Sequence, residues 1–297
     1  MPDYVVVTPA RDEARYIGDL AESLLAQSVP FDRWIVVDDG SSDGTQDIVR
    51  DYASKDPRIH LVERDGRGKR YPGCGDLVAS VVGLKSLPDI FAYDYIAKID
   101  ADLVLPADYF ERLFAMFAAD ERLGILGGHC YVPTSHGLVL DKVPDDHVNG
   151  ATKVYRRECL RQIWPLDEVW GWDTIDECRA QMAGWMTLSV KEPGVIHQKP
   201  MSGGAGGLVR GNFLIGRMSH FLGYRPEYLL LRVARHLFIK PVLVGSLAMA
   251  AGYVAATVRR EPRFENPEFI TYLRGQQLAR IRGMLSLRGA SESGGAK

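Results

Sequence analysis

Residues 34–45 have the sequence WIVVDDGSSDGT, in which a short apolar run ends at two aspartates and a turn. Trp34–Val37 is rich in β-branched residues, which is typical of a buried parallel strand. Asp43 or Thr45 can cap a following helix, whose apolar residues recur at helical spacing. The stretch therefore predicts a strand, a turn and a helix in succession.

The same alternation extends to both sides of this stretch. Further strands are predicted at Tyr4–Thr8, Ile59–Val62 and Tyr95–Ile99, with amphipathic helices between them. This order over the first ~120 residues indicates an α/β fold with a doubly wound, mostly parallel sheet. Because crossovers are right-handed, the strand ends meet at one edge, where open α/β sheets bind ligands.

Charged side chains follow three of these strands. They are Arg11, Asp12 and Glu13 after the first, Asp38 and Asp39 after the second, and Asp100 and Asp102 after the fourth. The four aspartates after the second and fourth strands repel each other unless a cation or a hydrogen-bonding ligand offsets their charge. Carboxylates suit a hard divalent cation that also holds a diphosphate. The alternative is structural, with Asp100 or Asp102 capping the next helix.

Three motifs here resemble the sequential signatures of glycosyltransferase family 2, which has the GT-A fold. They are TPARDE at 8–13, VDDGSSDGT at 37–45 and IDAD at 99–102, and the resemblance covers roughly residues 4–200. It implies a bacterial-type, membrane-associated enzyme that moves a sugar, with inversion, from a nucleotide-diphosphate donor to a glycan or lipid-linked acceptor hydroxyl. It also implies Mg²⁺ or Mn²⁺ as cofactor.

The resemblance also implies roles for single residues at the donor site. Asp39 accepts a hydrogen bond from the base, and Arg11 stands where the family often has Tyr. Asp100 lies near the ribose or the metal, Asp102 binds the metal, and His197 completes the metal site or is structural. The residues that line the nucleoside pocket are Pro9, Ala10, Arg11 and Glu13.

Two further features concern the phosphates and the acceptor. Lys69, in a Gly-rich basic loop, can neutralise a phosphate or belong to a solvated loop. Family 2 enzymes carry an acidic residue at a helix start, about eleven positions before a Gly-aromatic pair, which here is 184–185. By that match Asp173 is the general base, with Asp176 as fallback and a helix cap as the alternative. Trp170 and Trp172 then stack on an acceptor sugar or belong to the core.

The charge is distributed unevenly along the chain. Residues 203–297 hold 14 Lys and Arg against 5 Asp and Glu, a net charge of +9. Because the whole chain carries −2, residues 1–202 carry −11. We expect a catalytic domain at 1–202, a glycine-rich lid loop and linker at 203–224, a basic helical region at 225–288 and a disordered tail at 289–297. The basic region predicts contact with a membrane surface, and the alternative is a soluble helical subdomain.

Other classes of function are disfavoured by the sequence. The acidic body argues against nucleic acid as a ligand, and no GxGxxG follows the first strand. The four cysteines have no paired spacing, and no signal peptide precedes the first strand, so we expect the cytoplasmic face of the cell membrane. A sugar-phosphate nucleotidyltransferase and a non-catalytic nucleotide-sugar-binding protein remain the alternative functions.

Overall fold

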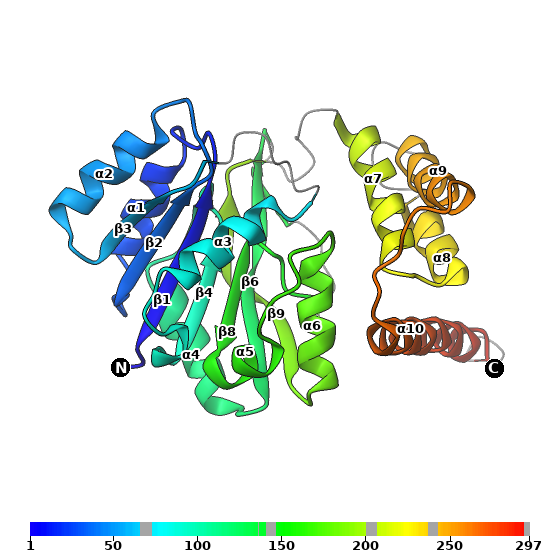
Figure 1. Cartoon of the computed structure of the whole chain (residues 1–297). Coiled ribbons are helices and arrows are strands. Elements are labelled where there is room, and N and C mark those ends of the chain that lie inside the picture. Colours follow the sequence, from blue (N-terminus) through cyan, green and yellow to red (C-terminus); the bar gives the residue numbers. More distant parts are fainter. Residues whose placement is uncertain (66–72, 136, 141–146, 200–206, 237–242, 294–297) are drawn as a thin grey trace. The chain divides into compact units, whose positions relative to one another are not determined.

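The structure is a computed structural model that describes residues 1–65, 73–135, 137–140, 147–199, 207–236 and 243–293. Its internal contacts divide the chain into two units, Met1–Pro200 and Met201–Lys297. The first unit holds the sheet, and the second is a set of helices (Figure 1).

Within the described residues, the first unit contains one nine-stranded sheet with the order β3-β2-β1-β4-β8-β6-β9-β5, and β7 pairs with β6. The strands are β1 (Tyr4–Ala10), β2 (Arg33–Asp38), β3 (Ile59–Glu63), β4 (Tyr95–Ile99), β5 (Leu103–Val104), β6 (Leu123–Thr134), β7 (Gly137–Leu140), β8 (Thr152–Arg156) and β9 (Met186–His197).

The first four strands run parallel, as the sequence predicts. β1 lies between β2 and β4, and β2 pairs with β3. β8 then runs antiparallel to β4 and β6, while β9 is parallel to β6 and antiparallel to β5. The carboxyl ends of the parallel strands β1, β2 and β4 therefore lie at one edge of the sheet. The antiparallel strand β8 begins at the same edge.

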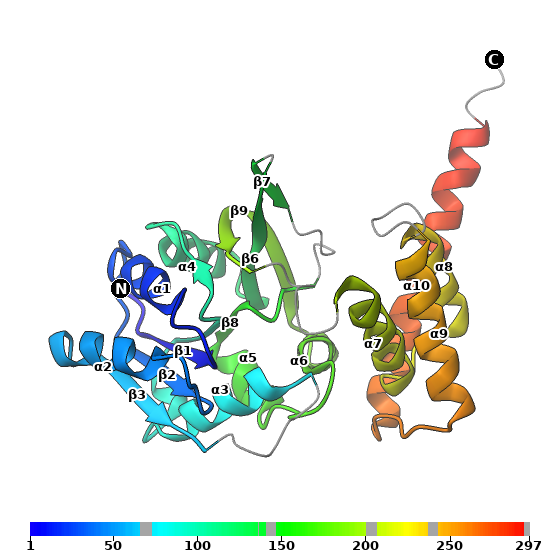
Figure 2. The same cartoon turned by 90° about the horizontal axis from the view of Figure 1, so that it is seen from above.

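Helices cover both faces of this sheet because successive strand residues point to opposite sides. Tyr4 and Val6 pack in one apolar core, and Val5 and Val7 in the other. Figure 2 shows α1 and α4 on one side of the strands, and α3, α5 and α6 on the other. The first core is covered by α1 (Ile17–Leu25), α2 (Thr45–Lys55) and α4 (Tyr109–Ala119), and the second by α3 (Gly75–Lys85), α5 (Arg157–Ile163) and α6 (Trp172–Met182).

The second unit contains the helices α7 (Gly207–Phe221), α8 (Pro226–His236), α9 (Val244–Val258) and α10 (Pro267–Ser293). Two glycines let α7 and α9 approach closely. A Cβ at Gly216 would lie 1.9 Å from the Met249 carbonyl oxygen, and one at Gly252 would lie 2.0 Å from that of Phe213. Among the described residues, no helix combines the length and the apolar character needed to cross a bilayer.

Candidate active site

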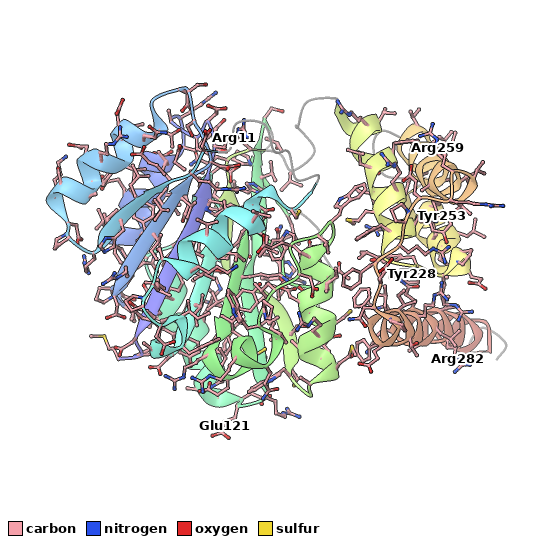
Figure 3. All side chains as sticks on the ribbon, in the orientation of Figure 1. Arg11, Glu121, Tyr228, Tyr253, Arg259 and Arg282 are labelled. Atoms are coloured by element: carbon pink, nitrogen blue, oxygen red, sulfur yellow. The ribbon has the colours of Figure 1, made fainter. Side chains whose placement is uncertain are left out.

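The carboxyl ends of β1, β2 and β4 form the edge that carries the predicted site residues. Ala10 is the register partner of Asp38, and the Asp39 amide donates a 2.8 Å hydrogen bond to the Ala10 carbonyl. The Asp100 amide donates a 3.0 Å hydrogen bond to the Ala151 carbonyl, just before β8. Figure 3 shows Arg11 at this end of the sheet and Glu121 at the opposite end. Pro9, Ala10 and Arg11 therefore lie beside the acidic ends of the neighbouring strands.

The loop after β1 is held by side chains from the loop after β2. Three backbone amides of the first loop donate to polar groups of the GSSDGT segment, and Asp43 also accepts from the Thr45 amide at the start of α2. The segment therefore braces the first loop, a role that the sequence analysis missed. The bonds run from Asp12 N to Ser41 Oγ (2.9 Å), from Glu13 N to Thr45 Oγ1 (2.9 Å) and from Ala14 N to Asp43 Oδ2 (2.8 Å).

Asp38 and Asp39 have different surroundings although they are adjacent in the sequence. Asp38 is fully buried, and its Oδ2 accepts from the Gly40 and Ser41 amides at 3.1 Å, so it shapes the turn. Asp39 is partly exposed. Its carboxylate lies 3.2 Å from Arg64 Nη1 and 3.7 Å from Arg11 Nη1. Two guanidinium groups thus already face the carboxylate that is predicted to bind the base.

Two lysines occupy directly opposed positions on β4 and β8 beneath this edge. Lys98 and Lys153 are register partners, and both are buried. Each Nζ lies 5.2 Å from the centroid of the Trp172 ring, so both cations face that indole. Like charges at opposed positions repel each other. Neighbouring carboxylates on α3 and α6 and at the end of β4 offset that repulsion.

Asp100 is held by one of these lysines. Lys98 Nζ donates to Asp100 Oδ1 at 2.5 Å and to Asp76 Oδ2 at 2.9 Å. Burial raises the pKa of Asp100, Lys98 opposes that rise, and the charge of Asp76 adds to it. Burial lowers the pKa of Lys98, but the two carboxylates raise it by more. The net pKa lies above its ordinary value, so this lysine stays charged. Asp100 is therefore an internal ion-pair partner.

Asp102 and His197 meet because β5 pairs with β9. Leu103 is the register partner of His197, and the Gln198 amide donates to the Asp102 carbonyl at 2.9 Å. His197 Nε2 lies 3.3 Å from Asp102 Oδ2, and both side chains are largely buried. The sequence analysis placed both residues at one metal site, and the fold brings these two together.

Some of the side chains at this edge suit a divalent cation. The described residues contain no group of three or more His, Cys, Asp or Glu side chains arranged to hold a metal. Asp102 and His197 are one carboxylate and one imidazole, a pair that suits Mn²⁺ when diphosphate oxygens fill further positions. These two residues fit such an ion, whereas the bond from Lys98 engages Asp100.

Glu13 lies in the same electrostatic neighbourhood. Burial raises the pKa of Glu13, Lys199 opposes the rise, and the charges of Asp102 and Asp100 add to it. Lys199 Nζ donates to Glu13 Oε2 and lies 4.9 Å from the Tyr16 ring centroid. The first loop is thus tied to the segment that follows His197.

Asp173 and Asp176 differ sharply although they lie on one helix. Asp173 is partly exposed in the first turn of α6. A Cβ built on Gly150 would lie 3.6 Å from the Asp173 Cβ, which places Asp173 beside the segment that binds Asp100. Asp176 is buried and accepts from Lys153 Nζ and Tyr155 Oη, both at 2.5 Å. This position suits a structural ion pair and leaves Asp176 no open side for an acceptor.

The two tryptophans also differ from the expected acceptor platform. Trp172 is buried against Lys98 and Lys153, which leaves little of the ring for a sugar to contact. Trp170 is partly exposed, and a Cβ at Gly73 would lie 2.2 Å from its Cδ1, so the indole packs on that glycine. Lys69 and residues 203–206 of the predicted lid loop and linker lie outside the described residues.

One expectation about charge needs correction. We expected four strand-end aspartates to depend on a bound cation or ligand for charge balance. In the structure Asp38 is buried in a turn, and side-chain cations already face Asp39 and Asp100. The reason is topological. Lys98 lies on β4, two residues before Asp100, and Arg64 directly follows β3, which pairs with the strand that ends before Asp39.

The sequence of this chain is similar to those of known proteins. The family model described as Glycosyl transferase family 2 matches residues 5–71. The succinoglycan biosynthesis protein ExoA of Rhizobium meliloti (strain 1021) is 32% identical over 111 residues, which is 37% of this chain and 31% of that protein. The putative teichuronic acid biosynthesis glycosyltransferase TuaG of Bacillus subtilis (strain 168) is 47% identical over 57 residues, or 19% of this chain and 23% of that protein. The chain thus spans less than a third of either relative.

Solved structures share the fold. The mannosyltransferase PcManGT from Pyrobaculum calidifontis, in complex with GDP-Man and Mn²⁺, superimposes with a TM-score of 0.57 at 18% identity, over 97% of this chain and 82% of that one. S. aureus TarS 1–349 in complex with UDP-GlcNAc gives 0.53 at 17% identity, over 86% and 73%.

The mixed sheet, its two helical layers and these likenesses define a protein with the GT-A fold, as the sequence predicts. Together with the family model that matches residues 5–71, the sequence relatives support a glycosyltransferase of family 2.

A stability measurement separates the two aspartates of α6. Asp176→Asn should lower the free energy of unfolding by about 3 kcal/mol, because it breaks a buried ion pair. Asp173→Asn should change it by less than about 1 kcal/mol, since Asp173 is partly exposed. Urea denaturation followed by circular dichroism measures both. Equal losses for the two variants would show that Asp176 has no special structural role.

Proposed function

We propose that this protein transfers a sugar, with inversion, from a nucleoside-diphosphate donor to an acceptor hydroxyl. The observation that carries the proposal is the pairing of Asp102 with His197 at the edge where β1, β2 and β4 end, with Asp39 and Asp173 close to the same edge. The match of residues 5–71 to the family 2 model supports the reaction type. In this proposal residues 1–202 form the catalytic domain.

The donor is assigned to the ends of β1 and β2. Pro9, Ala10, Arg11 and Glu13 line the nucleoside pocket, and Asp39 accepts a hydrogen bond from the base. Arg11 and Arg64, which face Asp39, then lie where they can donate to base or ribose oxygens. The complexes of relatives with GDP-Man and with UDP-GlcNAc support a nucleotide-sugar of this general kind.

Asp102 and His197 would hold a divalent cation, Mg²⁺ or Mn²⁺. When bound, such an ion offsets the charge of the departing diphosphate. The Mn²⁺ in the PcManGT complex supports this assignment. Asp100 lies two residues before Asp102, and Lys98 balances its charge.

Asp173 is assigned as the general base. Its carboxylate is partly exposed at the start of α6, so an acceptor hydroxyl can reach it. It takes the proton of that hydroxyl as the oxygen attacks the anomeric carbon and the diphosphate leaves. Asp176 is too enclosed for this task. We propose a glycan or lipid-linked acceptor. The names of ExoA and TuaG, which refer to succinoglycan and teichuronic acid biosynthesis, support a role in polysaccharide assembly.

Donor binding should depend on the cation. In a thermal-shift screen of nucleotide-sugars with Mn²⁺, the cognate donor at 100 times its Kd should stabilise the protein by about 2.7 kcal/mol. Asp102→Asn should abolish this Mn²⁺-dependent shift, and Asp51→Asn on exposed α2 is the matched control. An undiminished shift in EDTA, or in Asp102→Asn, would refute the metal site.

Turnover should depend on Asp173. Asp173→Asn should leave donor affinity near the wild-type value and reduce kcat by two orders of magnitude or more, on the order of 10²- to 10⁴-fold. Nucleoside diphosphate release in the presence of acceptor measures kcat, and calorimetry measures affinity. Wild-type binding without any transfer would favour a non-catalytic binding protein. Diphosphate release from a nucleoside triphosphate and a sugar phosphate would favour a nucleotidyltransferase.

We also propose that the helical region at 225–288 contacts the cytoplasmic membrane surface. One face of α9 exposes apolar side chains at helical spacing. The exposed Arg259 (Figure 3) and Arg260 follow the helix end. An apolar stripe beside basic residues suits the interface of an anionic bilayer. The stripe consists of Val244, Leu247, Val254 and Val258.

Vesicle flotation tests this contact. The protein should float with vesicles that contain about 30% anionic lipid, because each basic residue near such a surface adds to binding. The double variant Leu247→Glu/Val254→Glu should stay in the soluble fraction. The control Leu25→Glu, which changes an exposed leucine of the first unit, should float like wild type. If the double variant floats unchanged, or if wild type does not float and instead dimerises through this face, the membrane assignment is wrong.

A further inference from the structure

His147 lies between two carboxylates of α6. Its Nδ1 is 2.9 Å from Glu177 Oε2, and its Nε2 is 3.8 Å from Asp173 Oδ2. Asp173 and Glu177 are four residues apart on one helix, so they lie on the same face, one turn from each other. A single imidazole therefore spans both groups, with one ring nitrogen toward each.

The Glu177 side of this contact is rigid. Glu177 is buried, and its Oε1 accepts from the Val148 amide at 2.8 Å and lies 3.1 Å from Lys153 Nζ. It therefore fixes both the imidazole and the backbone next to it. A buried carboxylate that accepts from Nδ1 sets the orientation of the ring and turns Nε2 to the other side. That other side is the carboxylate of Asp173.

The charged groups around His147 form an alternating series. Asp173 and Glu177 face it from α6, and Lys153 faces it from β8. Beyond Lys153 lie Asp176 and the hydroxyl of Tyr155. Lys153 also donates to the Asp173 backbone carbonyl at 2.6 Å, so this lysine anchors the start of α6 as well. The partly exposed Asp173 and His147 thus form the outer end of a network whose other members are buried.

We propose that His147 is a positioning residue for Asp173: Glu177 fixes its Nδ1, and its Nε2 keeps the Asp173 carboxylate aimed at the acceptor. This inference rests on the proposed role of Asp173 as general base. An imidazolium beside the carboxylate attracts it and restricts its rotation. The acceptor proton then has one defined destination.

The charge state of the imidazole is consistent with this role. Burial lowers the pKa of His147, but the charge and hydrogen bond of Glu177 and the charge of Asp173 raise it by more, so the net pKa lies above its ordinary value. The protonated form is therefore favoured below that raised pKa. The attraction on Asp173 is lost as the pH rises through it.

Nuclear magnetic resonance tests the contact without reference to activity. The imidazole carbons of the seven histidines are titrated in the full chain, and the His147 signal is the one that disappears in His147→Gln. Its midpoint should lie above about 6.5 in wild type. It should fall by about one pH unit in Asp173→Asn, which removes a charge 3.8 Å away, and also fall in Glu177→Gln. A midpoint that Asp173→Asn leaves unmoved would overturn the inference.

Kinetics tests the consequence for transfer. His147→Gln should lower kcat on the order of 10- to 100-fold with little change in donor affinity, and should remove the step in the pH profile of kcat that coincides with the His147 midpoint. His60→Gln, on β3, is the matched control and should behave as wild type. Wild-type kcat and pH profile in His147→Gln, alongside an inactive Asp173→Asn, would refute the positioning role alone. If wild type transfers no sugar, the proposed function fails, and the titration still decides the contact.

Discussion

The site depends on two buried lysines that face each other across neighbouring antiparallel strands. Lys98 and Lys153 are register partners on β4 and β8, and both lie against the ring of Trp172. Two cations in such positions are tolerated only because carboxylates surround them. Lys98 binds Asp76 of α3 and Asp100, while Lys153 binds Asp176 and Glu177 of α6. The charges thereby fasten two helices to the sheet directly beneath the strand ends.

Much of the parallel half could be predicted from the sequence. The apolar runs at Tyr4, Trp34 and Tyr95 are local signals, and right-handed crossovers then leave one arrangement of their ends. That reasoning places Asp39, Asp100 and Asp102 at one edge, as the structure has them. It also places His197 near Asp102, although only through the family resemblance.

The partners of these residues could not be predicted, for a physical reason. Lys153 follows Lys98 by 55 positions and meets it only because β8 returns antiparallel to β4. Nothing in the local pattern of either strand fixes that register. The burial of Trp172 and the enclosure of Asp176 follow from the same pairing, so the acceptor platform and the fallback base were assigned without knowledge of it.

The partners also change the electrostatic argument for the ligand. The sequence gives residues 1–202 a net charge of −11, which suggests a strongly anionic edge that repels a diphosphate. In the structure, cationic side chains lie beside the carboxylates of that edge: Arg11 and Arg64 at Asp39, Lys98 at Asp100 and Lys199 at Glu13. These cations offset much of the local negative charge before any ligand arrives. Asp102 has the imidazole of His197 as its ion-pair partner within the described residues, and it is then the carboxylate best placed to attract a divalent ion. In the proposed function, the edge accommodates an anionic donor because side-chain cations lie beside Asp39, Asp100 and Glu13.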